Sequence, residues 1–258
     1  MFWNRKPSRF LGLIAATFIL VSDASLAAGT PATALVKRLQ ELYPNTQFST
    51  VSDSPVAGIF EVVMGRNIAY TDERGRYFLF GHLFDMPAQR DLTAEHKDEL
   101  ARIDFSQLPL NDAIKTVHGA GSRVVAVFSD PDCPYCRKLE PELAKVDDVT
   151  IYTFLMPLAE LHPDARNKAI SIWCGPDRAK AWSALMLRNQ NPSIATCDHP
   201  VDRNMALGER YQITGTPTLI AADGRVMPGA ASAAQIEAWL AKTTKPLAPP
   251  QASKGRAQ

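Results

Sequence analysis

The sequence predicts two folded domains: a small α+β domain over residues 31–86 and an α/β domain over 118–243, joined by a linker helix over 88–117. Three observations lead to this prediction. The first part of the chain combines one amphipathic helical pattern with several short strand patterns. Further on, a β-branched apolar run leads into a Cys-X-X-Cys sequence and a helical pattern. A long stretch without strand patterns then precedes a hairpin and a last helix.

Residues 1–27 have the composition of a signal peptide. Three basic residues precede an apolar run of 12 residues from Phe10 to Val21, and small residues lead up to Ala27. A run of 12 residues is too short to span a bilayer comfortably, which favours cleavage over a membrane anchor. We therefore expect an exported protein.

The charge of the chain excludes some classes of partner. Its 28 basic and 27 acidic residues give a net charge of +1. Removing residues 1–27 takes away three basic residues and one acidic residue, so the mature chain carries a net charge of −1. Without a basic block, neither nucleic acid nor an anionic membrane is expected as a main partner. All four cysteines remain after processing, in a compartment where disulfides persist.

The α+β domain begins with a helical pattern over residues 31–43. Strand patterns follow at 59–64, 68–71 and 77–84, separated by turn sequences. One helix and a few strands make a thin core, of a size that often needs a partner. Its apolar residues either pack on the single helix or form a dimer interface; the residues in question are Val62, Met64, Phe78, Phe80 and Phe84.

The linker is densely charged over residues 88–104, which suits a solvated helix beginning near Thr93. Leu108 to Val117 is expected to continue it as a second helical segment. The boundary between the domains is therefore placed inside this region.

The α/β domain is organised around Cys133 and Cys136, which lie between a strand at 124–128 and a helical pattern. Pro134 suits the first turn of that helix, because its missing N–H would have no intrahelical partner there. The unpaired N–H groups and the helix dipole favour a thiolate at Cys133. We expect Cys133 to be accessible and Cys136 to be shielded.

A structural disulfide or half of a zinc site is the alternative explanation of this pair. Zinc would need a second close pair, and Cys174 and Cys197 each stand alone, so no metal site is expected. Cys174 and Cys197 enclose 22 residues, and their pairing would contribute about 3 kcal/mol in the chain-entropy model. We interpret them as a structural disulfide; the alternative is a relay that accepts electrons from Cys136.

The rest of the domain follows in the order strand, helices, turn, hairpin and helix. A buried strand is predicted at 149–156, two or three helices at 160–210, and a final helix with a capping box from Ser232 to Gln235. Between them, Thr216-Pro217 resembles the cis-proline loop of the thioredoxin fold, and a cis bond is expected there. The Pro/Ala/Lys-rich tail over 244–258 is predicted to be disordered.

The chain resembles the periplasmic thiol:disulfide interchange proteins of the DsbC and DsbG type. In the second domain the resemblance rests on motifs around the four cysteines and the Thr-Pro turn, such as Phe128-Ser129-Asp130, Ile172-Trp173-Cys174 and Thr214-Gly215-Thr216-Pro217-Thr218. In the first domain it rests on Val56-Ala57-Gly58-Ile59-Phe60-Glu61-Val62-Val63 and Gly81-His82-Leu83-Phe84-Asp85. Together these motifs cover residues 31 to 243, nearly the whole mature chain.

The resemblance implies a V-shaped homodimer whose cystatin-like N-terminal domains join two thioredoxin-like domains. It makes Cys133 the attacking thiolate, Cys136 the resolving thiol and Thr216-Pro217 the substrate-binding loop. Tyr135, between the cysteines, is expected to face the substrate. The implied setting is the periplasm, where a membrane reductase of the DsbD type keeps the pair reduced.

Two features mix the family's patterns. The dipeptide Pro134-Tyr135 is typical of the DsbG type, whereas the Cys174/Cys197 pair is typical of the DsbC type.

A buried acid that thioredoxin carries six residues before its nucleophile has no counterpart in this chain, where that position is Val127. The sequence therefore assigns no carboxylate to take the proton from Cys136.

The leading functional hypothesis is an enzyme without a cofactor that isomerises and reduces wrong disulfides in misfolded exported proteins. A thiol oxidase or a sulfenic-acid reductase of the same fold is an alternative. A chaperone or binding module, which holds unfolded chains between protomers, is an alternative from another class.

Overall fold

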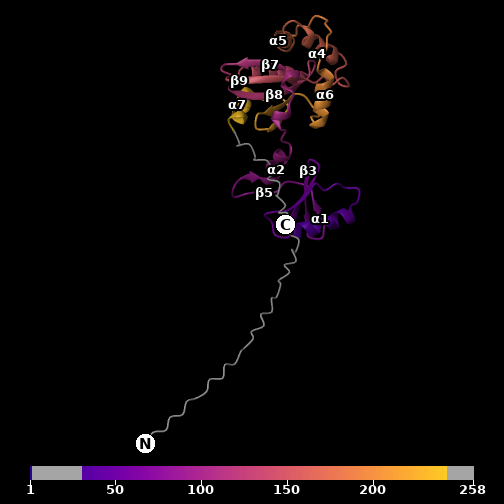
Figure 1. Ribbon diagram of the computed structural model, residues 1–258, viewed down its shortest axis with the longest axis vertical. Helices are drawn as coiled ribbons and strands as arrows, with labels where there is room; N and C mark the ends of the chain where they lie inside the picture. Colours follow the sequence, from indigo (N-terminus) through magenta and orange to yellow (C-terminus); the bar gives the residue numbers. More distant parts are fainter. Residues whose placement is uncertain (2–30, 243–258) are drawn as a thin grey trace. The chain divides into compact units, whose positions relative to one another are not determined.

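The computed structural model describes residues 31–242 together with Met1 (Figure 1). The predicted signal peptide at 1–27 and the predicted tail at 244–258 lie outside the described residues. Within the described part of the chain, no helix combines the length and apolar character needed to cross a membrane. The residues form two compact units, one built on 31–64 and 69–79, the other on 65–68 and 80–242.

The first unit packs one helix on a four-stranded sheet. The elements are α1 (Pro31–Leu42), β1 (Thr50–Asp53), β2 (Ile59–Met64), β3 (Asn67–Asp72) and β4 (Phe78–Leu79), and the strand order is β1-β2-β3-β4. Leu35 and Leu39, one helical turn apart, pack against Phe60 and Val62 of β2. The predicted helix and the first two predicted strands are thus confirmed.

Gly75 fixes the turn between β3 and β4. It has a φ of +68°, and a Cβ atom there would lie 2.5 Å from Leu39 Cδ2. The Tyr43 hydroxyl donates a hydrogen bond of 2.9 Å to the Gly75 carbonyl oxygen. Only glycine satisfies both the left-handed backbone and the close approach of the helix.

The predicted strand at 77–84 is wrong in extent. The chain forms β4 and then β5 (Phe84–Asp85), which pairs instead with β6 (Arg90–Asp91) in a separate two-stranded sheet. In the segment between β4 and β5, the Leu83 N–H donates a hydrogen bond of 2.8 Å to the Thr93 Oγ1 side-chain oxygen, and not to the backbone of a neighbouring strand. Three of the five apolar residues in question pack against the helix, as the first of the two hypotheses predicted: Val62, Met64 and Phe78. The other two, Phe80 and Phe84, are exposed.

The predicted linker helix at 88–117 is much shorter in the structure. Helix α2 (Leu92–Leu100) starts as expected, with Asp91 as its N-cap. Two 3₁₀ turns follow, and β7 (Ile114–His118) is a strand that pairs antiparallel with β9. Ile114 is buried and Lys115 exposed, which is the alternation of an edge strand. The second domain therefore begins before residue 118.

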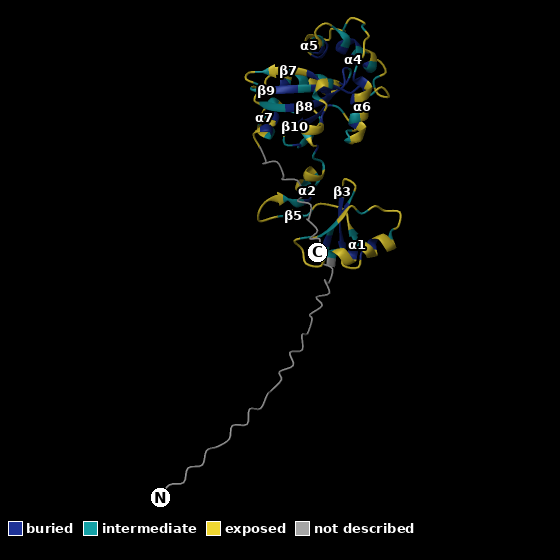
Figure 2. Ribbon diagram, viewed as in Figure 1, coloured by how far each residue is buried: buried dark blue, intermediate teal, exposed yellow. Residues whose placement is uncertain are grey.

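The second unit is built on a five-stranded sheet in the order β11-β10-β8-β9-β7. Its other strands are β8 (Arg123–Ser129), β9 (Val149–Leu155), β10 (Thr218–Ala221) and β11 (Val226–Pro228). Strands β8 and β9 are parallel, and the other neighbours are antiparallel. Every residue of β9 except Tyr152 is buried, and so is most of β8, as expected for strands covered on both faces (Figure 2).

Side chains of β8 alternate between two cores. Val125 and Val127 pack with α3 (Pro134–Leu143) and α7 (Ala233–Ala241), whereas Ala126 and Phe128 pack with residues of α6 (Val201–Arg210). The capping box that begins α7 is present as predicted. Helices α4 (Ala165–Cys174) and α5 (Arg178–Arg188) complete the predicted insertion and lie side by side (Figure 1).

Candidate active site

The two free cysteines lie where β8 leads into α3. Cys133 is the N-cap of α3, Pro134 is its first helical residue, and Cys136 lies in the first turn. This is the geometry predicted from the strand-to-helix pattern. The helix N-terminus directs backbone N–H groups and the positive end of the dipole toward Cys133.

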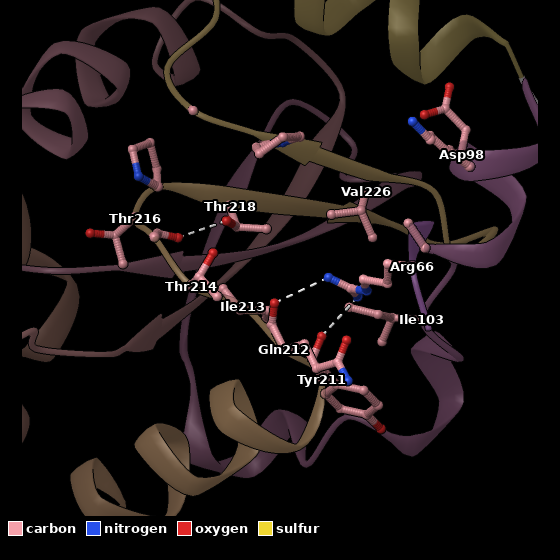
Figure 3. Close-up of a pocket in the computed structure, with 16 residues that line it drawn as sticks. Arg66, Asp98, Ile103, Tyr211, Gln212, Ile213, Thr214, Thr216, Thr218 and Val226 are labelled. Carbon is pink, nitrogen blue, oxygen red and sulfur yellow. Dashed lines mark hydrogen bonds between the residues drawn. The ribbon is translucent and has the colours of Figure 1, made fainter. Parts of the chain in front are cut away.

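A cis-proline loop faces this helix start. The Thr216–Pro217 peptide bond is cis, as predicted. Cys133 Sγ donates a hydrogen bond of 3.3 Å to the Thr216 carbonyl oxygen, so residues 83 positions apart meet at the site. The loop also forms one wall of a pocket, to which Thr214, Thr218 and Val226 contribute (Figure 3).

The expectation that Cys133 is accessible is wrong for this structure. Cys133 is 4% exposed and Cys136 is 1% exposed. Both pack in a core cluster with Trp173 and Trp182 of the helical insertion, and the Thr216 carbonyl covers the Cys133 sulfur. The Cys133 sulfur is therefore shielded from solvent in this structure.

The environment of Cys136 favours its protonated thiol. Burial raises the pKa of Cys136 to about 12, and the neighbouring Cys133 acts in the same direction. The Asp130 N–H, which donates to Cys136 Sγ over 3.4 Å, and the hydroxyls of Ser129 and Thr216 lower this pKa by a smaller amount. Near neutral pH, Cys136 is therefore a thiol rather than a thiolate.

Comparison with protein families assigns both units. Residues 26–94 match the model described as "Disulfide bond isomerase protein N-terminal domain", and residues 110–244 match a thioredoxin-like domain. A probable thiol:disulfide interchange protein DsbC of Bordetella pertussis is 40% identical over 209 residues, which are 81% of this chain and 74% of that protein. The chain belongs to the DsbC family.

Other members agree with this assignment. DsbC of Salmonella typhimurium is 27% identical over 240 residues, which cover 92% of this chain and 95% of that protein. The crystal structure of a disulfide interchange protein from Neisseria gonorrhoeae has a TM-score of 0.51 and 48% identity, covering 52% of this chain and 97% of that one. The resemblance found in the sequence and the predicted fold class are confirmed. This DsbC-family chain is therefore a thiol:disulfide interchange enzyme.

The carboxylates before Cys133 support the loop of this DsbC-family site. Asp130 is fully buried, and its carboxylate accepts from the N–H groups of Asp132 and Leu158, each over 2.7 Å. It also lies 2.9 Å from His162 Nδ1. Asp132 pairs with Lys168 Nζ over 2.6 Å. Fixed partners therefore hold both carboxylates in place.

Tyr135 and the second cysteine pair occupy different surroundings. Tyr135, between Cys133 and Cys136, is 60% exposed as expected, and Lys138 Nζ lies 5.4 Å from the centre of its ring. Cys174 and Cys197 form a disulfide with a Cα–Cα distance of 5.6 Å, which confirms the predicted pairing. This disulfide joins the end of α4 to the segment before α6.

Sequence reasoning missed three side chains of this region. His162 and Lys168 meet the two aspartates only through tertiary contacts, so no local pattern marked them. Glu140 did carry a signal, because it lies four residues after Cys136 on an amphipathic helix. Burial raises the pKa of Glu140 to about 7, and its carboxyl faces the indole of Trp182.

Proposed function

We propose that Cys133 is the attacking thiol and Cys136 the resolving thiol of a periplasmic disulfide isomerase and reductase. The observation that carries this proposal is the position of Cys133 Sγ, at the start of α3 and against the Thr216 carbonyl of the cis-proline loop. That position gives Cys133 the stabilisation of a helix N-terminus. Cys136 is the more deeply buried sulfur and has the raised pKa.

The reaction begins when the Cys133 thiolate attacks one sulfur of a substrate disulfide. A bond forms between Cys133 and the substrate, and the other substrate sulfur leaves as a thiolate. A second substrate thiol can then attack the substrate sulfur of this mixed disulfide, which forms a new substrate disulfide and regenerates Cys133. Alternatively, Cys136 attacks Cys133 Sγ, which releases a reduced substrate and leaves a Cys133–Cys136 disulfide.

Thr216, Pro217 and Tyr135 are proposed to bind the substrate chain. The loop lies directly beside Cys133, and the Tyr135 ring is exposed at the start of α3. In this proposal Cys174 and Cys197 stabilise the fold and take no part in electron transfer. A membrane reductase of the DsbD type returns the oxidised pair to the dithiol form.

Reactivation of a scrambled multi-disulfide protein tests the assigned roles. Cys133→Ala should lose both isomerisation and net reduction. Cys136→Ala should lose net reduction but retain isomerisation, because substrate thiols can still resolve the mixed disulfide. If Cys133→Ala kept its full reactivating effect, binding rather than thiol chemistry would explain it, and the proposal would be wrong.

The homodimer is proposed from the edge of the first unit's sheet and from the residues that directly follow it in the chain. That sheet has a short edge strand, β4, and the chain over residues 77–86 exposes several large apolar side chains: Tyr77, Leu79, Phe80, Phe84 and Met86. Leu79 is 64% exposed and Phe80 is 74% exposed. A second copy can cover such residues and pair with a sheet edge.

Sedimentation of full-length variants tests this assembly. Leu79→Asp should shift the protein toward the monomer and impair reactivation of the scrambled protein, while reduction of a small disulfide continues. Val56→Asp is the matched control, because Val56 is exposed but lies outside residues 77–86. A wild-type protein that sediments as a monomer would refute the dimer.

A further inference from the structure

Glu140 is an acid that has lost much of its hydration, and the reaction proposed above does not use it. It lies one helical turn after Cys136. It is on α3, four residues after Cys136, so the two side chains share one helix face about one turn apart. Its side chain is partly exposed, but its carboxyl is surrounded closely enough to lose most of its hydration. A buried acid without an ion-pair role is a candidate for proton transfer.

The indole of Trp182 connects Glu140 with the cysteines. Trp182 belongs to the core cluster that contains Cys133 and Cys136, and it is 1% exposed. Its Nε1 is buried and has no hydrogen-bond partner among the described residues. The group facing it is the Glu140 carboxyl. The indole N–H of Trp182 therefore lies beside the Glu140 carboxyl, and Trp182 belongs to the same core cluster as Cys136.

Other acids near the cysteines are already engaged. The Asp130 carboxylate accepts from two backbone N–H groups and contacts His162. Asp132 pairs with Lys168. Val127, six residues before Cys133, offers no acid. Glu140 is thus the carboxyl that remains on the Cys136 side of the described site.

We propose that Glu140 accepts the proton of Cys136, directly or through one water molecule, as Cys136 resolves the mixed disulfide. The Cys136 Sγ–H bond breaks and a Cys133–Cys136 disulfide bond forms. The substrate sulfur leaves as a thiolate, which can recover the proton from Glu140. Cys136 and Cys133 are oxidised as a pair, and the substrate is reduced by the same two electrons. This inference rests on the proposed roles of Cys133 and Cys136.

The acid–base properties of the two groups fit this step. With a pKa of about 12, Cys136 would be a free thiolate in only about one molecule in 10⁵ near pH 7. Transfer of the proton during the attack avoids this rare free thiolate. Glu140, whose pKa is raised to about 7 by burial, is an available acceptor above that pH and protonated below it. Resolution should therefore accelerate as the pH rises through about 7.

The neighbouring charged groups have other partners. On α3, Arg137 Nη1 donates to Asn189 Oδ1 and Glu142 pairs with Lys145. On α5, Arg178 lies over the Trp173 ring and Arg188 donates to Gln190. On α7, Glu237 pairs with Arg123. The Trp182 indole, which lies beside the Glu140 carboxyl, lowers the pKa of Glu140 and so partly opposes the effect of burial.

The test separates the two chemical steps in the full-length reduced protein. An aromatic disulfide that releases a coloured thiolate reports attack by Cys133 as a first release and resolution by Cys136 as a second. Both rates are measured in single turnovers across the pH range. In Glu140→Gln, the second release should slow at least tenfold at pH 8 and lose its inflection near pH 7, while the first stays within about twofold of wild type.

Two variants keep this test decisive. Glu140→Asp should retain an inflection, because it keeps a carboxylate, and it serves in place of the Gln variant if that one fails to fold. Glu209→Gln, the same substitution at an exposed site on α6, should match wild type. A wild-type second release in Glu140→Gln, or equal slowing of both releases, would overturn the proposal. A second release in Cys136→Ala would instead overturn the assignment of the resolving cysteine.

Discussion

Removal of the Cys174–Cys197 disulfide should lower the stability of the second domain and spare the reaction. The bond closes a loop with 22 residues between the cysteines, and loop-closure entropy predicts a loss of about 3 kcal/mol in the free energy of unfolding. In a domain of this size, each kcal/mol corresponds to roughly 3–5 °C, so the melting temperature should fall by about 10–15 °C.

The surroundings of the bond explain why activity should remain. Cys174 ends α4, whose other residues already pack with α5 through Trp173 and Trp182. The Ala195 N–H also donates to Ser171 Oγ, over 3.5 Å, so a contact across the loop persists without the disulfide. The α4–α5 core that surrounds Cys133 and Cys136 is therefore kept in the folded variant.

The assay compares wild type with the variant Cys174→Ala/Cys197→Ala. A single replacement would leave a free thiol that could form mixed disulfides, so both cysteines are changed together. Thermal unfolding is followed by circular dichroism, and reduction of a small disulfide is measured well below the melting temperature. Full stability with lost turnover would refute the structural role and favour an electron relay.

Three further predictions concern other parts of the chain. When the reduced protein is alkylated near neutral pH and mapped, Cys133 should be labelled before Cys136, whose raised pKa keeps it protonated until well above pH 9; preferential labelling of Cys136 would reverse the assignment. Gly75→Ala should cost about 1–3 kcal/mol in chemical denaturation, because the new Cβ would meet Leu39 Cδ2 at 2.5 Å in a left-handed backbone; an unchanged midpoint would contradict this. A chain that starts at residue 102 should melt cooperatively, whereas one that starts at 119 lacks β7 and should melt at a lower temperature; equal melting temperatures would show that β7 contributes little.

Local patterns determined much of this protein. The β-branched run before Cys133 and the Pro134 start of the helix each predict their own local structure, and both predictions hold because adjacent residues set the backbone geometry. The cis bond at Thr216-Pro217 followed from the resemblance to the thioredoxin fold, and it is present as well. The pairing of Cys174 with Cys197 also followed from the sequence, since the other two cysteines were already assigned to one motif.

Tertiary packing decided the rest. Residues 114–118 have an ambiguous pattern, and pairing with β9 makes them a strand. The burial of Cys133 depends on Thr216, 83 residues away, whose carbonyl oxygen lies against the sulfur only in the folded domain. The pKa of Glu140 likewise depends on burial in the folded domain and on Trp182 from another helix. Burial and pKa depend on distant segments brought together in space, so a sequence pattern marks the position of these groups, but only the fold determines their chemistry.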